Sequence, residues 1–176
     1  MEKLEVIGAQ KLKGTIKISG SKNSSLPILA ATLLSKKKVK IYNLPNVQDI
    51  ETMILLLRSL GSNIKYNKKN KSVDISNAKN IKTFASYNLV KTMRAGIIVL
   101  GPLLARFNKA KISLPGGCAI GARPVDIHLK ALSKLGVKHK IIGGYIYAKA
   151  PKGLIGNVIK FSKVSVGATE NLIIAA

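Results

Sequence analysis

LLSKKKVKIYNLPNVQDIETMILLLRSLGSNIKY, residues 33–66, is matched further along the chain by LLARFNKAKISLPGGCAIGARPVDIHLKALSKLGVKHKI, residues 103–141. Each copy contains an apolar helix end, a strand that closes in Leu-Pro, a loop, a second helix that ends in Leu-Gly, and the start of a hairpin. Repetition at this period is typical of a fold built from equivalent units. The second copy is longer, and its extra residues fall in the loop GGCAIGARP, 116–124.

Local signals within each copy predict a βαβαββ unit. GTIKIS (14–19) alternates like a half-buried strand, and a helix with Pro27 in its first turn is expected to follow it. The next helix is predicted to have Asn46 as its N-cap and to stop at Gly61. In the second copy, residues 88–105 are predicted to form one helix, apolar nearly all round and therefore buried.

A third copy begins near the end of the sequence. NVIKFS (157–162) alternates as a strand, and KVSVGATENLIIAA (163–176) has the pattern of an opening helix. That helix stops on apolar residues without a polar cap, which leaves its last carbonyls without partners. We therefore expect the chain to be the front portion of a longer protein.

Composition narrows the classes of protein. Among 176 residues, 47% are apolar, which is enough for a substantial core. The single cysteine excludes an internal disulfide and a zinc site of several cysteines. No leader peptide is expected, and the apolar stretches are shorter than the roughly 20 residues of a membrane span, so we expect a cytoplasmic protein without membrane contact.

The net charge of +23 raises the possibility of a nucleic-acid partner. The amino-acid composition argues against a nucleic-acid partner, because nearly all the basic residues are lysines and only 5% of residues are aromatic. Base reading favours arginine, and single-strand binding favours aromatic stacking. An anionic small-molecule substrate is the better use of this positive field.

Three equivalent helix starts carry residues suited to binding anions. They are SGSKNSS with Lys22 and Asn23, LVKTMR with Lys91 and Arg94, and SKVSVGAT with Lys163 and Ser165. Free backbone N–H groups and cations at helix N-termini attract anions, so one pocket fed from all three units is predicted. The alternative is that these cations are merely solvated.

Cys118 is either a small buried hydrophobe or a reactive group. The preceding glycines allow a close approach of backbone to ligand, and Arg123 could hold a phosphate or carboxylate. A free thiol titrates at about 8.5 and is mostly protonated at neutral pH, so it can donate a proton. His128 and His139 lack metal-ligand spacing, and His128 could serve packing or function equally well.

Taken in order, SGSKNSSLPILAA, LVKTMRA, SLPGGCAIGARPVDIH and KVSVGAT resemble the enolpyruvyl transferases that act on UDP-N-acetylglucosamine. The resemblance covers essentially the whole chain and implies an α+β fold, the αβ-prism of repeated βαβαββ units. Two full units, at about 21–80 and 85–150, and the start of a third, at about 155–176, would form a truncated catalytic domain over 21–176. Residues 1–20 would be a strand segment that packs with a second domain.

The resemblance also implies a reaction. The enolpyruvyl group of phosphoenolpyruvate passes to the 3-hydroxyl of UDP-N-acetylglucosamine and phosphate leaves, in the first committed step of peptidoglycan synthesis, with no cofactor and no metal. Cys118 would be the proton donor and the group alkylated by fosfomycin, with Lys22 and Arg123 as further catalytic residues. The implied substrate-binding residues are Lys22, Asn23, Arg94, Arg123, Pro124, Val125, Asp126, Ile127, Lys163, Val164, Ser165 and Val166.

Other interpretations stay open at this point. The chain could be an inactive fragment of a broken or split gene, or, less favoured, a basic nucleic-acid-binding domain. The related shikimate-pathway enolpyruvyl transferase shares the fold but is not expected to have the cysteine loop. Because the base for the sugar hydroxyl and further arginines would come from a missing C-terminal domain, the 176 residues alone are expected to lack part of the site.

Overall fold

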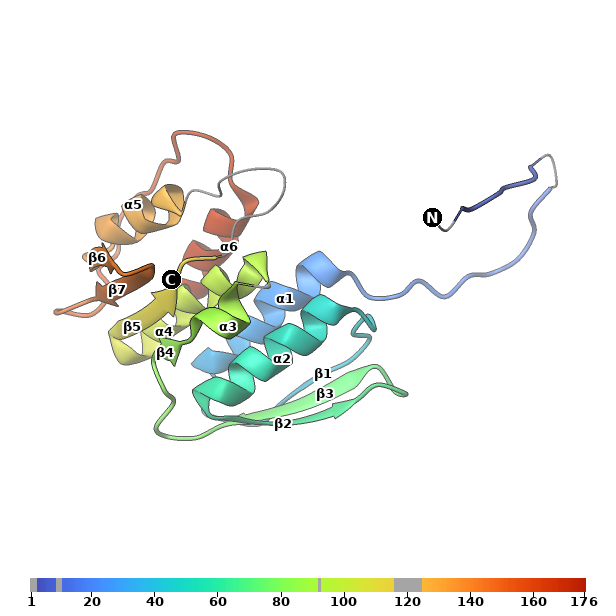
Figure 1. The fold of residues 1–176 in the computed structure, drawn as a ribbon, viewed down its shortest axis with the longest axis horizontal. Coiled ribbons are helices and arrows are strands. Elements are labelled where there is room, and N and C mark those ends of the chain that lie inside the picture. The colour runs from blue at the N-terminus through green and yellow to red at the C-terminus, as the bar shows by residue number, and fades with distance from the viewer. Residues whose placement is uncertain (1–2, 9–10, 92, 116–124) are drawn as a thin grey trace.

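The computed structural model describes residues 3–8, 11–91, 93–115 and 125–176. Helices pack against two sheets in which most neighbouring strands are antiparallel. The segment before the first helix extends away from this body (Figure 1). Buried apolar residues from both sheets and their helices form one continuous core. The chain therefore has mixed helices and strands, as expected for an α+β fold.

The first unit contains one three-stranded sheet. Its elements are α1 (Lys22–Ala31), the short 3₁₀ helix η1 (Thr32–Leu34), β1 (Val39–Ile41), α2 (Gln48–Leu60), β2 (Ser62–Asn67) and β3 (Ser72–Asn77). The strands lie in the order β1-β3-β2, all antiparallel. Helix α2 turns Ile50, Met53, Leu57 and Leu60 into the core at helical spacing, and all four are fully buried.

The second unit repeats this plan with one more strand. Its elements are β4 (Phe84–Ala85), α3 (Tyr87–Val90), the 3₁₀ helix η2 (Arg94–Val99), α4 (Leu100–Phe107), β5 (Lys109–Ser113), α5 (Asp126–Lys134), β6 (Lys138–Ile142) and β7 (Tyr145–Lys149). The sheet order is β4-β5-β7-β6, with β4 parallel to β5. Helix α6 (Val166–Ala175) follows and packs on α4 and α5.

Equivalent hydrogen bonds confirm the repeat found in the sequence. The backbone N–H of Leu44 donates to the carbonyl of Lys71 at 2.8 Å, and that of Leu114 donates to the carbonyl of Gly144 at 2.8 Å. In both units the Leu-Pro landmark is thus tied to the tip of the following hairpin. Each hairpin also returns beside its own first strand, so β1-β3-β2 and β5-β7-β6 have the same order.

Two strands predicted from alternation were wrong. Residues 14–19 and 157–162 form no strand, and Ile16, Ile18 and Val158 are 84%, 77% and 91% exposed. Alternation marks one face of a strand as apolar, but a strand also needs a neighbouring edge with which to pair its backbone. Neither segment has such an edge among the described residues, so the first sheet has no described counterpart of β4.

Helix boundaries were predicted less well than helix positions. Helix α1 begins at Lys22, so Pro27 lies in its interior instead of its first turn. Asn46 is not the cap of α2; its amide oxygen accepts from the Tyr66 hydroxyl at 3.2 Å, and Val47 holds the cap position without a side-chain bond. Gly61 ends α2 in the left-handed region at φ 107°, as predicted.

The single helix predicted over residues 88–105 is divided into α3, η2 and α4. Met93 is extended at φ −136°, so the chain leaves helical geometry before η2 begins. Gly96 then packs against Val90, where an added Cβ would lie only 3.1 Å from a Val90 methyl carbon. Apolar patterning predicted burial correctly but could not reveal this fold-back.

Asn171 is a fully buried amide that ties α6 to the second unit. Its Oδ1 accepts from the backbone N–H of Gly101 at 2.7 Å, and its Nδ2 lies 3.2 Å from the carbonyl of Ile97, to which it donates. The same Nδ2 lies 3.1 Å from Nδ1 of His128 on α5. An added Cβ on Gly101 would collide with Asn171, so the close approach of these helices requires glycine there.

Replacing Asn171 by alanine should lower the free energy of unfolding by about 2–4 kcal/mol, because it leaves the buried N–H of Gly101 without an acceptor and opens a cavity. Urea denaturation measures the change. The matched control is Asn157→Ala, since Asn157 donates to the carbonyl of Lys134 from an exposed position, and its loss should cost less than about 1 kcal/mol. Equal effects of the two substitutions would contradict the role assigned to Asn171.

Candidate functional site

A cavity of about 880 Å³ lies where the starts of α1, α5 and α6 meet. Residues from all three predicted units line it, which agrees with the shared pocket expected from the sequence. The first N–H groups of a helix have no partner within the helix, so each start offers hydrogen-bond donors and the positive end of a dipole. The cavity is therefore suited to anionic ligands.

The first unit contributes the start of α1. Ser21 caps the helix by accepting from the N–H of Ser24 at 3.4 Å, which brings Lys22 and Asn23 to the first turn. Lys22 Nζ lies 2.9 Å from a carboxylate oxygen of Asp49 in the first turn of α2. At Gly20, an added Cβ would overlap the carbonyl oxygen of Asn43, so the approach to the helix requires glycine.

The third unit contributes the start of α6 in the same way. Ser165 caps this helix by accepting from the N–H of Ala168 at 3.3 Å. Lys163, Val164, Ser165 and Val166 all line the cavity, and Val164 and Val166 are 96% and 70% exposed. Serine caps at both α1 and α6 show that the first and third units present their helix starts by one local device.

The second unit frames the cavity from the remaining side. Val125 and Ile127 at the start of α5 line it, and so does the buried His128, whose ring is linked to Asn171. Pro115 also lines it. The two described residues that flank segment 116–124 therefore both line the cavity, and the segment itself lies outside the described residues.

Most of the described site residues predicted from the sequence come together here. Eight line the cavity: Lys22, Asn23, Val125, Ile127, Lys163, Val164, Ser165 and Val166. Asp126 does not line it; its Oδ2 lies 3.5 Å from Lys130 on the same helix, so its neighbours reach the cavity and it does not. Cys118, Arg123 and Pro124 lie outside the described residues, as does the side chain of Arg94, whose backbone begins η2.

Two carboxylates in the cavity were missed as site residues. Asp49 was not among the predicted site residues, yet it pairs with Lys22. Glu170 lies one turn into α6, is half-buried, and lines the cavity. Burial raises its pKa above the ordinary value of 4.5, because desolvation disfavours the charged form. A lone carboxylate on the apolar helix 166–175 was the signal available in the sequence.

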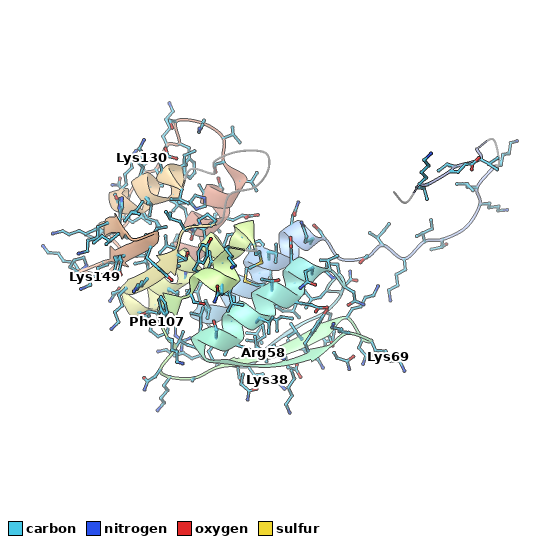
Figure 2. All side chains as sticks on the ribbon, viewed as in Figure 1. Lys38, Arg58, Lys69, Phe107, Lys130 and Lys149 are labelled. Carbon is cyan, nitrogen blue, oxygen red and sulfur yellow. The ribbon has the colours of Figure 1, made fainter. Side chains whose placement is uncertain are left out.

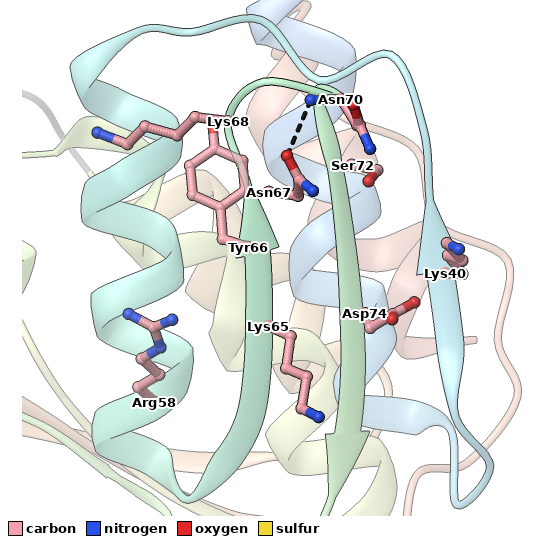
Figure 3. Close-up of a pocket in the computed structure, with 9 residues that line it drawn as sticks. All are labelled: Lys40, Arg58, Lys65, Tyr66, Asn67, Lys68, Asn70, Ser72 and Asp74. Atoms are coloured by element: carbon pink, nitrogen blue, oxygen red, sulfur yellow. Dashed lines mark hydrogen bonds between the residues drawn. The ribbon is translucent and has the colours of Figure 1, made fainter.

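A second hollow, of about 790 Å³, lies at the first sheet and includes Lys65, Asp74 and Arg58 (Figure 3). Three of its charged groups, Arg58, Asp74 and Lys68, have partners within the protein. Arg58 donates to the carbonyl of Ile64 at 2.9 Å, Asp74 pairs with Lys38 at 3.3 Å, and Lys68 pairs with Glu51. Among the described residues, no first-turn residue of a helix lines this hollow, whereas the first turns of α1 and α6 line the first cavity. We therefore take the first cavity as the candidate site.

Most of the lysines are a surface feature. Lys38, Lys69, Lys130 and Lys149 project outward from separate parts of the body (Figure 2).

Among the described residues, no cluster of three or more His, Cys, Asp and Glu side chains is arranged to hold a metal ion. No helix in that part of the chain is both long and apolar enough to cross a bilayer.

Comparison with known sequences places the chain. The sequence model of the EPSP synthase (3-phosphoshikimate 1-carboxyvinyltransferase) family matches residues 6–176. The chain belongs to this family. It is 76% identical over 176 residues to the UDP-N-acetylglucosamine 1-carboxyvinyltransferase of Pelagibacter ubique, and 58% identical to that of Helicobacter pylori. It spans 42% of the length of each of these relatives.

Solved structures of EPSP synthase family members and related enolpyruvyl transferases share the fold. The enolpyruvyl transferase NikO of Streptomyces tendae matches 84% of this chain with a TM-score of 0.68 and 20% identity. EPSP synthase of Acinetobacter baumannii matches 92% of this chain with a TM-score of 0.71 and 16% identity. The chain covers 32% and 37% of those two proteins. At these identities the likeness supports the enolpyruvyl transferase fold and nothing finer.

The raised pKa of Glu170 predicts a pH-dependent gain in stability on substitution. Between pH 4.5 and its raised pKa, the folded chain binds more protons at Glu170 than the unfolded chain, so its contribution to stability falls as pH rises through that window. Glu170→Gln should therefore raise the melting temperature relative to wild type at pH 7 and not at pH 4. The control is Glu5→Gln, which removes the same negative charge from an exposed position, with both variants measured in 0.2 M salt. A gain independent of pH would contradict this prediction.

Proposed function

We propose that this chain is the N-terminal part of an enzyme that transfers the enolpyruvyl group of phosphoenolpyruvate to the 3-hydroxyl of UDP-N-acetylglucosamine and releases phosphate. The observation that carries the proposal is the convergence of helix starts and of Lys22 and Lys163 on one cavity, whose lining includes Pro115 and Val125, the described residues on either side of the cysteine segment. The products would enter peptidoglycan synthesis, and the enzyme would act in the cytoplasm.

Sequence similarity favours this substrate over 3-phosphoshikimate. The family takes its name from the shikimate enzyme, but the relatives at 76% and 58% identity are both UDP-N-acetylglucosamine 1-carboxyvinyltransferases. The solved EPSP synthase is only 16% identical. The cysteine loop points the same way, because it carries a proton donor that the resemblance links to the UDP-N-acetylglucosamine enzymes.

Binding is proposed to depend on a division of charge in the cavity. Phosphoenolpyruvate and a nucleoside diphosphate sugar both carry negative charge and repel each other in water. Lys22, the free N–H groups at the starts of α1 and α6, and Arg123 offset that charge and let the two substrates meet. Asn23 would contact phosphoenolpyruvate beside Lys22. Lys163 and Ser165 would hold the nucleotide sugar, with Arg94 and the start of α5 beside it.

Chemistry is proposed to proceed by addition and then elimination. The oxygen of the sugar 3-hydroxyl forms a bond to C2 of phosphoenolpyruvate, while C3 takes a proton from the Cys118 thiol and becomes a methyl group. The hydroxyl proton goes to a base from the part of the protein beyond this chain. The bond from C2 to the phosphate oxygen then breaks, and the leaving phosphate takes the proton held by the base. One methyl proton returns to the Cys118 thiolate, so the enol ether and inorganic phosphate remain. The Cys118 thiol would also be the group alkylated by fosfomycin.

The direct test joins these 176 residues to the remaining part of the Pelagibacter ubique relative and measures phosphate release from the two substrates. We expect turnover that requires both phosphoenolpyruvate and UDP-N-acetylglucosamine. We expect none from the 176 residues alone, because the base is absent. A folded, completed chain that releases no phosphate would contradict the proposed function, and turnover with shikimate 3-phosphate instead of the sugar nucleotide would assign the other substrate.

Cys118→Ser in the completed chain should lower kcat by about 100-fold or more, because a serine hydroxyl is too weak an acid to replace the thiol as proton donor. Affinity for UDP-N-acetylglucosamine should stay within about twofold, since the proton donor acts on the other substrate. Steady-state kinetics and calorimetric titration separate these effects. An unchanged kcat would remove Cys118 from the mechanism.

Lys22→Gln should raise KM for phosphoenolpyruvate by about tenfold or more, because it removes a cation from the start of α1 and leaves Asp49 unpaired beside an anion. Lys68→Gln is the matched control. Lys68 is also a lysine in an ion pair, with Glu51, but it lies at the other hollow and should leave KM unchanged. Equal effects of the two substitutions would indicate a general influence of net charge and not a contact at Lys22.

A further inference from the structure

Glu170 is a charged residue of the cavity that the proposed mechanism does not use. It lies on α6, half-buried, with its side chain in the cavity wall. It forms no hydrogen bond or ion pair with any described residue. The other carboxylate of the cavity, Asp49, is paired with Lys22 at 2.9 Å. Glu170 is thus an uncompensated negative charge within a site that must hold two anions.

An unpaired carboxylate withdrawn from water is unfavourable unless a partner arrives. Apolar side chains line the same cavity, including Leu26 and Pro27 of α1 and Ile97 of η2, and they offer no hydrogen bonds. Desolvation raises the pKa of Glu170, which agrees with a group partly withdrawn from bulk solvent into the cavity wall. A ligand that donates hydrogen bonds would supply the missing partner.

We propose that Glu170 is a specificity-determining residue that accepts hydrogen bonds from hydroxyl or amide N–H groups of the sugar in the nucleotide substrate. The inference rests on the proposed function and deepens it. An ionised carboxylate is purely a hydrogen-bond acceptor, so it can serve only a donor group. The N-acetylglucosamine ring offers hydroxyl groups and an acetamido N–H and carries no charge.

Phosphoenolpyruvate cannot fill this role. At neutral pH it presents only phosphate and carboxylate oxygens, which Glu170 would repel. The carboxylate therefore favours placing the neutral, donor-bearing sugar beside α6 and leaving the anion to Lys22 and the helix starts. Attraction for one substrate and repulsion of the other would together prevent either from occupying the wrong half of the cavity.

The test uses Glu170→Ala and Glu170→Gln in the completed chain described above, with Glu51→Gln as a control. Glu51 is a helix carboxylate that pairs with Lys68 at the other hollow. Titrations measure the Kd of UDP-N-acetylglucosamine and of UDP, and steady-state kinetics give KM for phosphoenolpyruvate. Melting curves confirm that each variant is folded.

We expect Glu170→Ala to weaken UDP-N-acetylglucosamine binding by about tenfold, corresponding to roughly 1.4 kcal/mol, and UDP binding by less than twofold. Glu170→Gln should lie between wild type and Ala, because its amide oxygen can still accept. KM for phosphoenolpyruvate should be unchanged or lower. Glu51→Gln should behave as wild type in all three measurements.

Three outcomes would overturn the assignment. UDP-N-acetylglucosamine binding that is unchanged in Glu170→Ala would remove the contact, an equal loss for UDP would move it away from the sugar, and a matching rise in KM for phosphoenolpyruvate would show a general defect. Failure of the proposed function is distinguishable, because the wild-type completed chain would then show neither binding nor turnover. That result would also overturn this inference.

Discussion

The buried side-chain amide of Asn171 determines where α6 lies, and the cavity depends on it. One residue accepts from the backbone of Gly101, donates to Ile97 and meets His128, so it fixes α6 against both neighbouring parts of the second unit. A buried amide is unfavourable in a core unless all its hydrogen bonds are made, so only one arrangement of α6 against its neighbours is favourable. Together with the buried Ala168 and Leu172, these bonds hold α6 so that its start faces the cavity.

The helix starts around the cavity carry a local electrostatic conflict that a ligand would resolve. A lysine at the first residue of α1 opposes the helix dipole, and Asp49 from α2 compensates it. In the third unit, Lys163 precedes the Ser165 cap. Among so many lysines the position relative to a helix start, and not the charge itself, distinguishes a candidate ligand contact from a solvated surface group.

The sequence predicted the repeat well because Leu-Pro and Leu-Gly mark places where the backbone itself is constrained. Leu44 and Leu114 donate to the same point of their hairpins, and such contacts recur with the sequence pattern. Strands at 14–19 and 157–162 failed because pairing needs an edge from elsewhere in space. Asn46 was taken as a cap, but it bonds across to Tyr66 on the hairpin, a tertiary contact that local propensity does not encode. Glu170 was missed because one acidic residue on a helix usually faces solvent.

The two complete copies differ most where chemistry is proposed, and this difference follows from the scaffold they share. In the first unit the connection after Leu44 is short, and Leu44 itself is buried with 1% exposed. The second unit keeps the same strand, the same bond from Leu114 to the hairpin and the same following helix, but it inserts residues between Pro115 and Val125. Because the flanking residues Pro115 and Val125 belong to the shared frame and line the cavity, the length of the connection between them could change without moving the helices. Lengthening one connection of a repeated unit can therefore add reactive residues at the cavity while the helices and strands of the unit stay in place.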